Sequence, residues 1–263
     1  MTRIFLSTLC IGLLLSSCKE NTQNPDPTDP VLTVDEIAKK YLDAQVDIEA
    51  AEVTPDNFKT MKVTLDFEGE GSTVYNYGLD YYEDGRLKSY QELGDESTTK
   101  TYSYSDDQVS LESDNGLIKS YALDAQGLAI KANDYEGEKQ YFYKNGYLVY
   151  AMLAEPSNLR VYDQNGDLTQ LGDYAKYEYT DYPNTVRQEV TGPMTVHWTF
   201  RDSFLGKFST NLLKSASFNE SNSKWTLQFD YAFDEQGRVT QIVIDRLWEA
   251  TNETSTITYD LSY

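Results

Sequence analysis

A recurring hairpin signature constrains the fold of this 263-residue chain more than any other feature. An aromatic residue or leucine is followed by Asp or Asn, then by Gly, and then by an apolar residue that resumes alternation. Asp-Gly and Asn-Gly tolerate the positive φ of two-residue hairpin turns, and Asp-x-x-Gly suits a type I turn closed by a left-handed Gly that forms a bulge. Each copy therefore predicts the tip of a β-hairpin. The copies are Tyr82–Leu87, Leu123–Leu128, Tyr143–Leu148, Tyr162–Leu168 and Phe233–Val239.

The segments that flank these tips alternate between apolar and polar residues, which is the main sign of a strand with one buried face. Turn signals recur at intervals of roughly ten to twenty residues, as in a meander of short strands. The sequence therefore predicts an all-β domain, an antiparallel meander that forms a partly open barrel or a strongly curved sheet. The predicted core faces are Val63, Leu65 and Phe67; Trp225, Leu227, Phe229, Tyr231 and Phe233; and Ile257, Tyr259, Leu261 and Tyr263.

One short helix is predicted ahead of the strands. Thr33 to Glu36 has the spacing of a capping box, and apolar residues recur after it at helical intervals. We expect this helix to pack across an opening or an end of the sheet. A membrane-surface helix is the alternative, but Asp35, Glu36 and the single Lys39-Lys40 pair make a poor basic face. The apolar stripe is Val34, Ile37, Ala38, Tyr41 and Leu42.

The start of the chain has the order of a bacterial export signal. Arg3 supplies a positive charge, Ile4–Leu15 is an apolar run too short to span a bilayer as a stable helix, and Ser16-Ser17 lead into Cys18. This order resembles the lipobox of bacterial lipoproteins, which implies cleavage before Cys18 and acylation of its thiol. Cys18 is therefore predicted as a lipid attachment site. The alternative is an ordinary secretory signal followed by an incidental cysteine.

Composition divides the chain into a signal peptide (1–17), an acylated cysteine with a Pro-rich tether (18–32), a short helix with its connector (33–57) and a β domain (58–263). Prolines with polar neighbours make the tether a semi-extended spacer, which suits a domain held off a membrane. The predicted location is the outer membrane, through a lipid anchor. Lys19-Glu20 resembles the start of a surface-export signal of Bacteroidetes-type lipoproteins, but the acidic cluster that normally follows is missing. The periplasmic face and the cell surface therefore both stay open.

The charge balance excludes some partners. The chain has 22 Lys and Arg against 43 Asp and Glu, a formal net charge of -21. Nucleic-acid binding needs a basic footprint, so no nucleic-acid partner is predicted. A domain lying flat on anionic lipid is disfavoured for the same reason. Solubility at a crowded surface is the favoured interpretation of this charge, and cation binding is the alternative.

Two known families resemble parts of this sequence. Phe233–Val239 resembles the YD repeat of large shell-forming β-proteins, but those shells need many more repeats than this chain holds. A closer resemblance is to Bacteroidetes lipoproteins of unknown function with a porin-like, partly open β-barrel. It runs from about Val63 to Tyr263 and rests on the lipobox, the hairpin repeats and two further segments. These segments are Tyr177–Asn184 and Leu205–Lys214, in which Leu213 stands where a proline is expected. The resemblance implies a fold and transfers no functional residues.

Alternation alone leaves open which face of such a barrel meets lipid. A transmembrane barrel places apolar residues outside and polar residues inside, whereas a barrel in water does the reverse. A lipid anchor would be redundant for an integral barrel, the predicted turns are uniformly short, and the mean hydropathy is -0.58. These features favour a barrel that does not cross the membrane.

The sequence assigns no catalytic, cofactor-binding or metal-binding residue. His197 is the only histidine and is expected on the polar face of a strand. The sequence has no nucleophile-elbow pattern that could supply a serine for a triad with this histidine. With one histidine and no free cysteine thiol in the predicted mature chain, the sequence offers too few ligands for a zinc site. Asp163–Asp167 resembles half a calcium loop, but Leu168 and Tyr174 stand where Gly and Glu are required, so a hairpin turn is predicted.

Three functional hypotheses follow. The first is a non-enzymatic, lipid-anchored envelope module that binds a glycan or an envelope protein. The second is a glycan-binding lipoprotein of a polysaccharide uptake system, in which Trp198, Trp225 and Trp248 form a stacking platform; core packing of these residues is the alternative. The third is a carboxylate-based hydrolase, which would need two convergent carboxylates with shifted pKa values in a cleft.

Overall fold

Antiparallel strands account for most of the fold in the computed structural model. The structure describes residues 33–50, 52–69, 71–94, 98–114, 116–134, 137–152, 159–192, 203–220 and 223–263. The elements are α1 (Val34–Ala44), β1 (Thr60–Phe67), β2 (Gly71–Tyr81), β3 (Leu87–Glu92), β4 (Thr99–Tyr104), β5 (Gln108–Ser113), β6 (Gly116–Leu123), β7 (Ala129–Asp134), β8 (Gly137–Lys144), β9 (Tyr147–Met152), β10 (Arg160–Tyr162), β11 (Leu168–Leu171), β12 (Ala175–Pro183), the 3-10 helix η3 (Ser203–Leu205), β13 (Asn211–Glu220), β14 (Ser223–Phe233), β15 (Val239–Trp248) and β16 (Glu253–Ser262).

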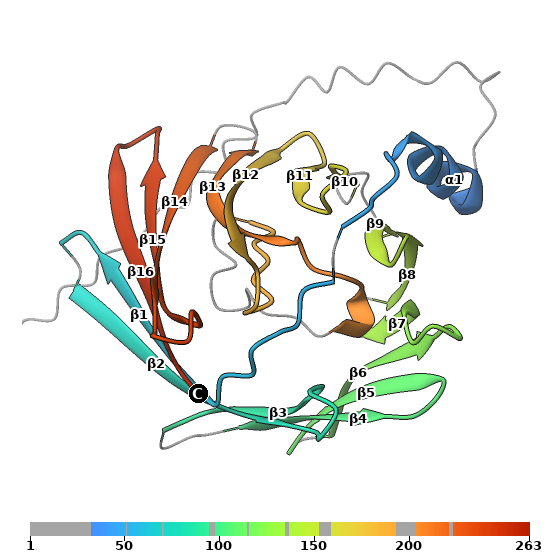
Figure 1. The fold of residues 1–263 in the computed structure, drawn as a ribbon, viewed down its shortest axis with the longest axis horizontal. Coiled ribbons are helices and arrows are strands. Elements are labelled where there is room, and N and C mark those ends of the chain that lie inside the picture. The colour runs from blue at the N-terminus through green and yellow to red at the C-terminus, as the bar shows by residue number, and fades with distance from the viewer. Residues whose placement is uncertain are drawn as a thin grey trace, which may run out of the picture. The chain divides into compact units, whose positions relative to one another are not determined.

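The strands form one sixteen-stranded sheet that curls into a nearly closed barrel (Figure 1). Strands that follow one another in the chain pair along the ring, and β16 pairs with β1 in register from Thr60–Ser262 to Phe67–Ser255. The exception is the seam between β9 and β10, where the two strands meet through the isolated bridge Tyr150–Leu159. The predicted all-β meander and partly open barrel are confirmed.

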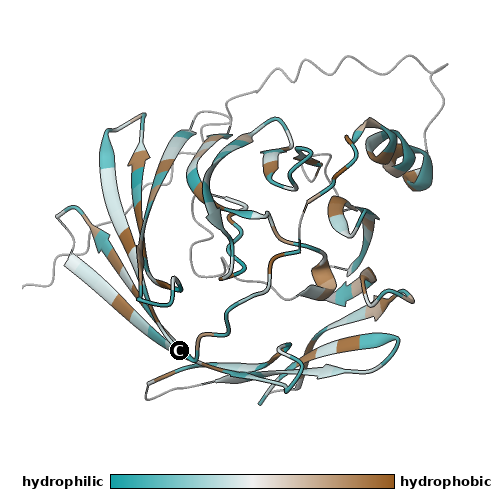
Figure 2. Ribbon diagram, in the orientation of Figure 1, coloured by the Kyte–Doolittle hydropathy of each residue, from teal (hydrophilic) through white to brown (hydrophobic). Residues whose placement is uncertain are grey.

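Apolar and polar residues alternate along the strands (Figure 2), and the burial of the apolar ones places them on the inner face of the wall. In β1, Met61, Val63 and Leu65 are buried, whereas Lys62 and Asp66 are exposed. The expected inward position of Phe233 is wrong. A register shift between Ala232 and Phe233 breaks the alternation, so Phe233 is 38% exposed and packs against the ring of Tyr182 instead. The apolar faces predicted for the other strands lie in or against the main core.

The five predicted tip segments each join two neighbouring strands, and four share one backbone geometry. Each of these four contains a five-residue turn with Gly in fourth place, over residues 82–86, 124–128, 163–167 or 234–238. The first residue of the turn donates its N–H to the carbonyl of the fifth, the Gly donates to the carbonyl of the first, and the register shifts beside the turn. Gly85, Gly127, Gly166 and Gly237 all have φ between 78° and 83°. Asp84-Gly85 is therefore part of a four-residue tip rather than a two-residue turn. Asn145-Gly146 is the two-residue turn, with φ of 52° and 83°.

All five tips lie at the same end of the barrel. In an up-and-down barrel alternate turns fall at the same end, and these tips follow β2, β6, β8, β10 and β14. We call this end the tip mouth. The hairpin turns that follow odd-numbered strands, such as those after β1, β11 and β15, lie at the opposite end. The chain enters β1 and leaves β16 at the tip mouth, because Thr60 pairs with Ser262.

The predicted helix covers the seam, which confirms where it was expected to pack. Ala38 is buried with Val149 and Tyr150 of β9, and Leu159 beside β10 packs against the same cluster. Ile37, Tyr41 and Leu42 of the predicted stripe belong to it as well. Figure 1 shows α1 (dark blue) outside the ring, beside β9.

Gln45, directly after α1, closes the polar edge of the seam. Its side-chain Nε2 donates to the carbonyl of Arg160 at 3.0 Å, and its Oε1 accepts the N–H of Tyr162 at 3.2 Å. These are backbone groups of the edge strand β10. One amide side chain therefore makes the two hydrogen bonds that a neighbouring strand would make. Gln45 is 6% exposed, so water does not replace it.

Replacing Gln45 with Ala should lower the free energy of unfolding by about 1–3 kcal/mol, because two buried backbone groups of β10 lose their partners. Urea unfolding of the purified chain measures this through the shift in midpoint. The control is the neighbouring truncation Val46→Ala. Because Val46 is 49% exposed, this substitution should leave the free energy of unfolding nearly unchanged. Equal effects of the two substitutions would contradict the role given to Gln45.

Gly127→Ala and Gly166→Ala form a second matched pair at the tips. Both place a side chain at positive φ, which costs roughly 1–2 kcal/mol. The added Cβ meets nothing within 4 Å at Gly127, but at Gly166 it collides with the Tyr147 hydroxyl and the Ala50 Cβ. Gly166→Ala should therefore be more destabilising by a further ~1–3 kcal/mol. Equal thermal shifts would show that Ala50 and Tyr147 do not press on this tip.

Candidate functional site

A segment between α1 and β1 crosses the tip mouth (Figure 1). We call this segment, residues 45–50 and 52–58, the strap. Glu49 donates its N–H to the carbonyl of Gln164, and Asn145 donates to the carbonyl of Ile48. Further along, Asp56 donates its N–H to the carbonyl of Thr185 at 2.7 Å. The strap is thus held by two hairpin tips and by the loop after β12.

The strap is also anchored in the core. Ile48 and Phe58 are buried in the main cluster that fills this half of the barrel. On the other side of the lumen, Phe204 of η3 packs on Val109, Tyr121 and Ala129. The sequence predicted neither the strap's position in the mouth nor η3.

A cavity of about 550 Å³ lies between the strap, the tips and the segment around η3. A second hollow of about 700 Å³ adjoins it, and the two share Arg86, Gln126, Leu128 and Ser203. The first cavity is the candidate site. Its lining comprises Glu52, Val53, Pro55, Asp84, Gly85, Arg86, Gln126, Leu128, Gly146, Tyr147, Asn184, Arg187, Ser203, Gly206, Lys207, Phe208, Ser209 and Thr210.

The charge of this lining differs from that of the chain. Three cationic side chains, Arg86, Arg187 and Lys207, face two carboxylates, Glu52 and Asp84. The lining residues that the structure describes are therefore net positive by one, in a chain of net charge -21. The sequence indicated no functional role for any of the three cations. Arg86 lies in a predicted tip and Lys207 in a family-like segment, whereas Arg187 has no local signal.

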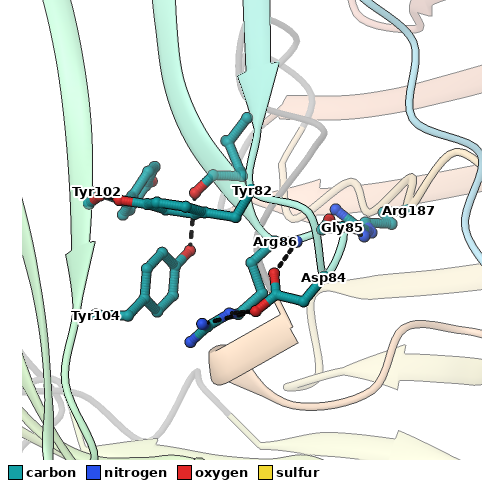
Figure 3. A network of polar contacts seen from close by, with 8 residues as sticks. Tyr82, Asp84, Gly85, Arg86, Tyr102, Tyr104 and Arg187 are labelled. Atoms are coloured by element: carbon teal, nitrogen blue, oxygen red, sulfur yellow. Dashed lines mark hydrogen bonds and ion pairs between the residues drawn. The ribbon is translucent and has the colours of Figure 1, made fainter.

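Arg86 is fixed by an acid and by aromatic rings (Figure 3). Its Nε and Nη2 lie 2.8 and 2.7 Å from Asp84 Oδ2, and its guanidinium lies 4.3 Å from the centroid of the Tyr104 ring. The hydrogen bond from Arg86 holds the pKa of the Asp84 carboxyl below its usual range. Tyr82 supports the Tyr104 ring edge-on at 5.7 Å and donates its hydroxyl to the carbonyl of Tyr102.

Arg187 enters the cavity in an unusual backbone conformation. Its φ is 58°, a left-handed value uncommon for a residue with a side chain. Its Nη2 donates to the carbonyl of Gly85 at 3.0 Å, but its Nε is buried and has no hydrogen-bond partner among the described residues. Asn57 of the strap donates to the same carbonyl, and its Oδ1 is also buried without a partner there. Two unsatisfied polar atoms thus lie beside one carbonyl at the cavity.

Lys207 comes from the extended segment after η3. Its N–H donates to the carbonyl of Gly146 at 2.8 Å, and its ammonium lies 5.5 Å from the ring centroid of Tyr147. Burial raises the pKa of the Tyr147 phenol, which keeps it neutral. Gly206 permits this approach, since a Cβ there would lie 2.8 Å from the carbonyl oxygen of Gly146.

The two family-like segments meet at this cavity. Asn184 donates its N–H to the carbonyl of Thr210 at 2.8 Å and its Nδ2 to the carbonyl of Ser209 at 3.1 Å. Next to them, Asp167 accepts the N–H and the Nδ2 of Asn211, both at 2.8 Å. Burial raises the pKa of the Asp167 carboxyl, partly offset by these hydrogen bonds from Asn211.

The other sequence-predicted residues lie elsewhere. Cys18, His197 and Trp198 fall outside the described residues. Trp225 and Trp248 stack on each other at 5.4 Å and 9° on β14 and β15, at the end opposite the tip mouth. Trp225 packs against the main core, so this pair is not part of the cavity.

The half calcium loop is a hairpin tip, as predicted. Asp163 Oδ1 accepts the N–H groups of Asn165 and Asp167. Within the part of the chain that the structure describes, no group of three or more His, Cys, Asp and Glu is placed to hold a metal ion.

A solved structure shares the fold of this chain, but the comparisons with known proteins assign the chain to no family. The structure is similar to that of a porin-like protein from Bacteroides uniformis ATCC 8492, with a TM-score of 0.58 and 18% identity over 80% of this chain and 100% of that one. The expected porin-like barrel is thereby confirmed, as a likeness of fold. MucB in complex with MucA(peri) is matched at a TM-score of 0.14 and 8% identity, over 78% of this chain and 88% of that one, too low to bear on the fold.

Sequence comparisons add nothing to this likeness. No family model matches the chain, and no curated protein does. Membership of the lipoprotein family and the likeness to YD repeats stay predictions.

Asp167 and Asp84 should affect stability with opposite pH dependence. The pKa of Asp167 is raised in the fold, so its contribution is present below its ordinary pKa of about 4 and is lost as pH rises through the folded value. The pKa of Asp84 is lowered, so its contribution is present above its ordinary pKa and is lost as pH falls.

Unfolding free energies measured from about pH 2 to about pH 7, a range that extends to both sides of the ordinary carboxyl pKa, test this. Relative to wild type, Asp167→Asn should gain stability as pH rises, and Asp84→Asn should lose it. Slopes of the same sign would contradict the two environments described for these carboxyls.

Proposed function

We propose that this chain is a non-enzymatic binding module of the bacterial cell envelope, tethered to the outer membrane by lipid on Cys18. The observation that carries the proposal is the tip-mouth cavity, a concave site with hydrogen-bond donors and positive charge at the rim of a packed barrel. Recognition sites of this kind are clefts with few convergent polar groups. Either a small ligand or an envelope partner could enter from this end.

The outer wall supports a domain held beside a membrane rather than within it. Lys62, Asp66, Asp230 and Asp245 are exposed on the outer face of their strands, while the apolar residues between them face the core. A lipid-facing barrel needs the opposite polarity. Separately, no helix among the described residues is long and apolar enough to span a membrane.

The acids of the cavity favour binding over hydrolysis. A glycosidase pairs two carboxylates, one of which has a raised pKa and acts as the general acid. In this cavity the pKa of Asp84 is instead lowered by its bond to Arg86, so it is poorly suited to donate a proton. The remaining lining acid, Glu52, comes from the strap.

The anchor can be tested by cell fractionation of a Cys18→Ser variant. Wild-type protein should incorporate labelled palmitate and require detergent for extraction from the outer membrane, because two or three acyl chains give a stable anchor. Cys18→Ser should lose the label and become extractable without detergent. Cys10→Ser, the matched control within the predicted signal, should behave as wild type.

A Cys18→Ser protein that stays in the membrane fraction would overturn the tether. For the wild-type protein, protease shaving of intact cells decides between the periplasmic face and the cell surface, which the proposal leaves open.

A further inference from the structure

We propose that α1 is a releasable cover over a self-associating strand edge, and that a barrel whose α1 has detached pairs through β9 with the β9 of a second copy of this chain. The proposal goes beyond the binding function proposed above, since it concerns neither the tip-mouth cavity nor the lipid on Cys18. It draws on the burial and composition of β9 and on the contact that holds α1 over it.

β9 is an edge strand that is buried on both of its faces. Within the part of the chain that the structure describes, its seam side is paired only at the isolated bridge between Tyr150 and Leu159. Every residue from Tyr147 to Ala151 is nevertheless at most 6% exposed, and successive residues of a strand point to opposite faces. Edge strands ordinarily carry charges or bulges that deter pairing with other chains. β9 therefore needs another element of the fold to shield it.

The composition of β9 favours pairing with an identical strand. Its six residues, Tyr147–Met152, read Tyr-Leu-Val-Tyr-Ala-Met and include no charged residue, proline or glycine. Among the strands β1–β16 only β11 also lacks charge, and β11 lies inside the sheet between β10 and β12. Short uncharged segments of high β-propensity pair readily with identical segments. Two copies of β9 can therefore meet without like charges opposite each other, although the chain as a whole carries a net charge of -21.

β10 of the same chain is a poor substitute for a second copy. It spans three residues, Arg160–Tyr162, against six in β9, so closing the seam within one barrel pairs at most half of β9. Arg160 is also fixed by an ion pair with Glu189 at 3.3 Å, and both side chains are mostly buried. A second β9, antiparallel to the first, matches the full length of the edge. It also gives the two-fold symmetry that is commonest among homodimers.

The cover is held by a small apolar contact. Ala38 is the buried residue of α1 and packs with Val149 and Tyr150, and the Tyr41 ring lies 5.2 Å from the Tyr150 ring. An eleven-residue helix depends on such packing, because isolated helices shorter than about 12–15 residues are marginal in water. Loss of this contact therefore removes both the helix and the shield of β9. Gln45 follows α1 directly, so the same release frees the two backbone groups of β10 that it binds.

Sedimentation velocity of the full chain in density-matched detergent micelles tests the cover. Ala38→Asp places a charge in the contact between α1 and β9, so the chain should dimerise at least about tenfold more tightly than wild type. Leu42→Asp, at the partly buried margin of the same cluster, is a second way to detach α1 and should give the same dimer. Lys40→Asp is the matched control, because it adds the same side chain at an exposed position of the same helix. It should behave as wild type.

A second substitution tests the edge itself. Val149→Lys, added to Ala38→Asp, puts a charge on the uncovered strand and should return the chain to a monomer, because lysines on paired edges repel each other. Val243→Lys in the same background is the control. Val243 lies on β15, between β14 and β16, so this lysine should leave the dimer intact. Amide hydrogen exchange reports whether α1 has lost its protection, and thermal unfolding checks that each barrel folds.

Several results would overturn the proposal. These are variants that lose the protection of α1 but stay monomeric, association that survives Val149→Lys, association lost equally with Val243→Lys, or a broad distribution of aggregates in place of a dimer. Full protection of α1 in both Ala38→Asp and Leu42→Asp would also overturn it, since a contact that tolerates a buried charge is not a releasable cover. None of these results depends on Cys18, so the anchor and the strand edge can fail separately.

Discussion

Closure of the sheet is the constraint on which the rest of this structure depends. Sixteen strands in one sheet would leave two long polar edges exposed to other chains. Pairing of β16 with β1 joins the two ends of the chain's meander, and the edges that remain, at β9 and β10, are covered by α1 and bridged by the Gln45 side chain. The same closure brings the chain into β1 at the tip mouth. The strap has to cross that mouth because α1 covers the seam while β1 begins beside the end of β16.

In the hairpin repeat, the position directly after the tip glycine carries side chains of different chemistry. The residue after the conserved-geometry Gly is Arg86, Leu128, Asp167 or Arg238 in the four similar tips. Leu128 lines the cavity with Arg86, Asp167 is buried against Asn211, and Arg238 is stacked on Tyr263. The turn geometry is set by the Gly and by local hydrogen bonds, so the following side chain is free to differ. Placement around the mouth, rather than the motif itself, decides whether that side chain lines the cavity.

Local patterns predicted the strands, the tips and the helix, because each depends on residues close in sequence. The alternation of Val63 and Leu65 and the stripe of α1 are of this kind. A bulge was predicted at this tip, but its effect on Phe233 was missed, because the register shift exposes Phe233 without a visible break in the alternation of the sequence. The site was missed for a different reason. Arg187 meets Gly85 across 102 residues, and Gln45 meets Tyr162 across 117, and irregular segments such as these have no period to read.

The packed interior explains why the cavity lies at the rim. Ile242, Ile244 and Ile257 are at most 1% exposed and face inward, and the strap adds Ile48 and Phe58 to the same cluster. Side chains that exclude water leave no room for a wide aqueous lumen in this half of the barrel, in spite of a fold similar to that of a porin-like protein. The concave surface that remains lies where the strap, the tips and the segment after η3 fail to fill the mouth. Among its described lining residues three cations face two carboxylates, so the charge of this concave surface is opposite in sign to the net charge of the chain as a whole.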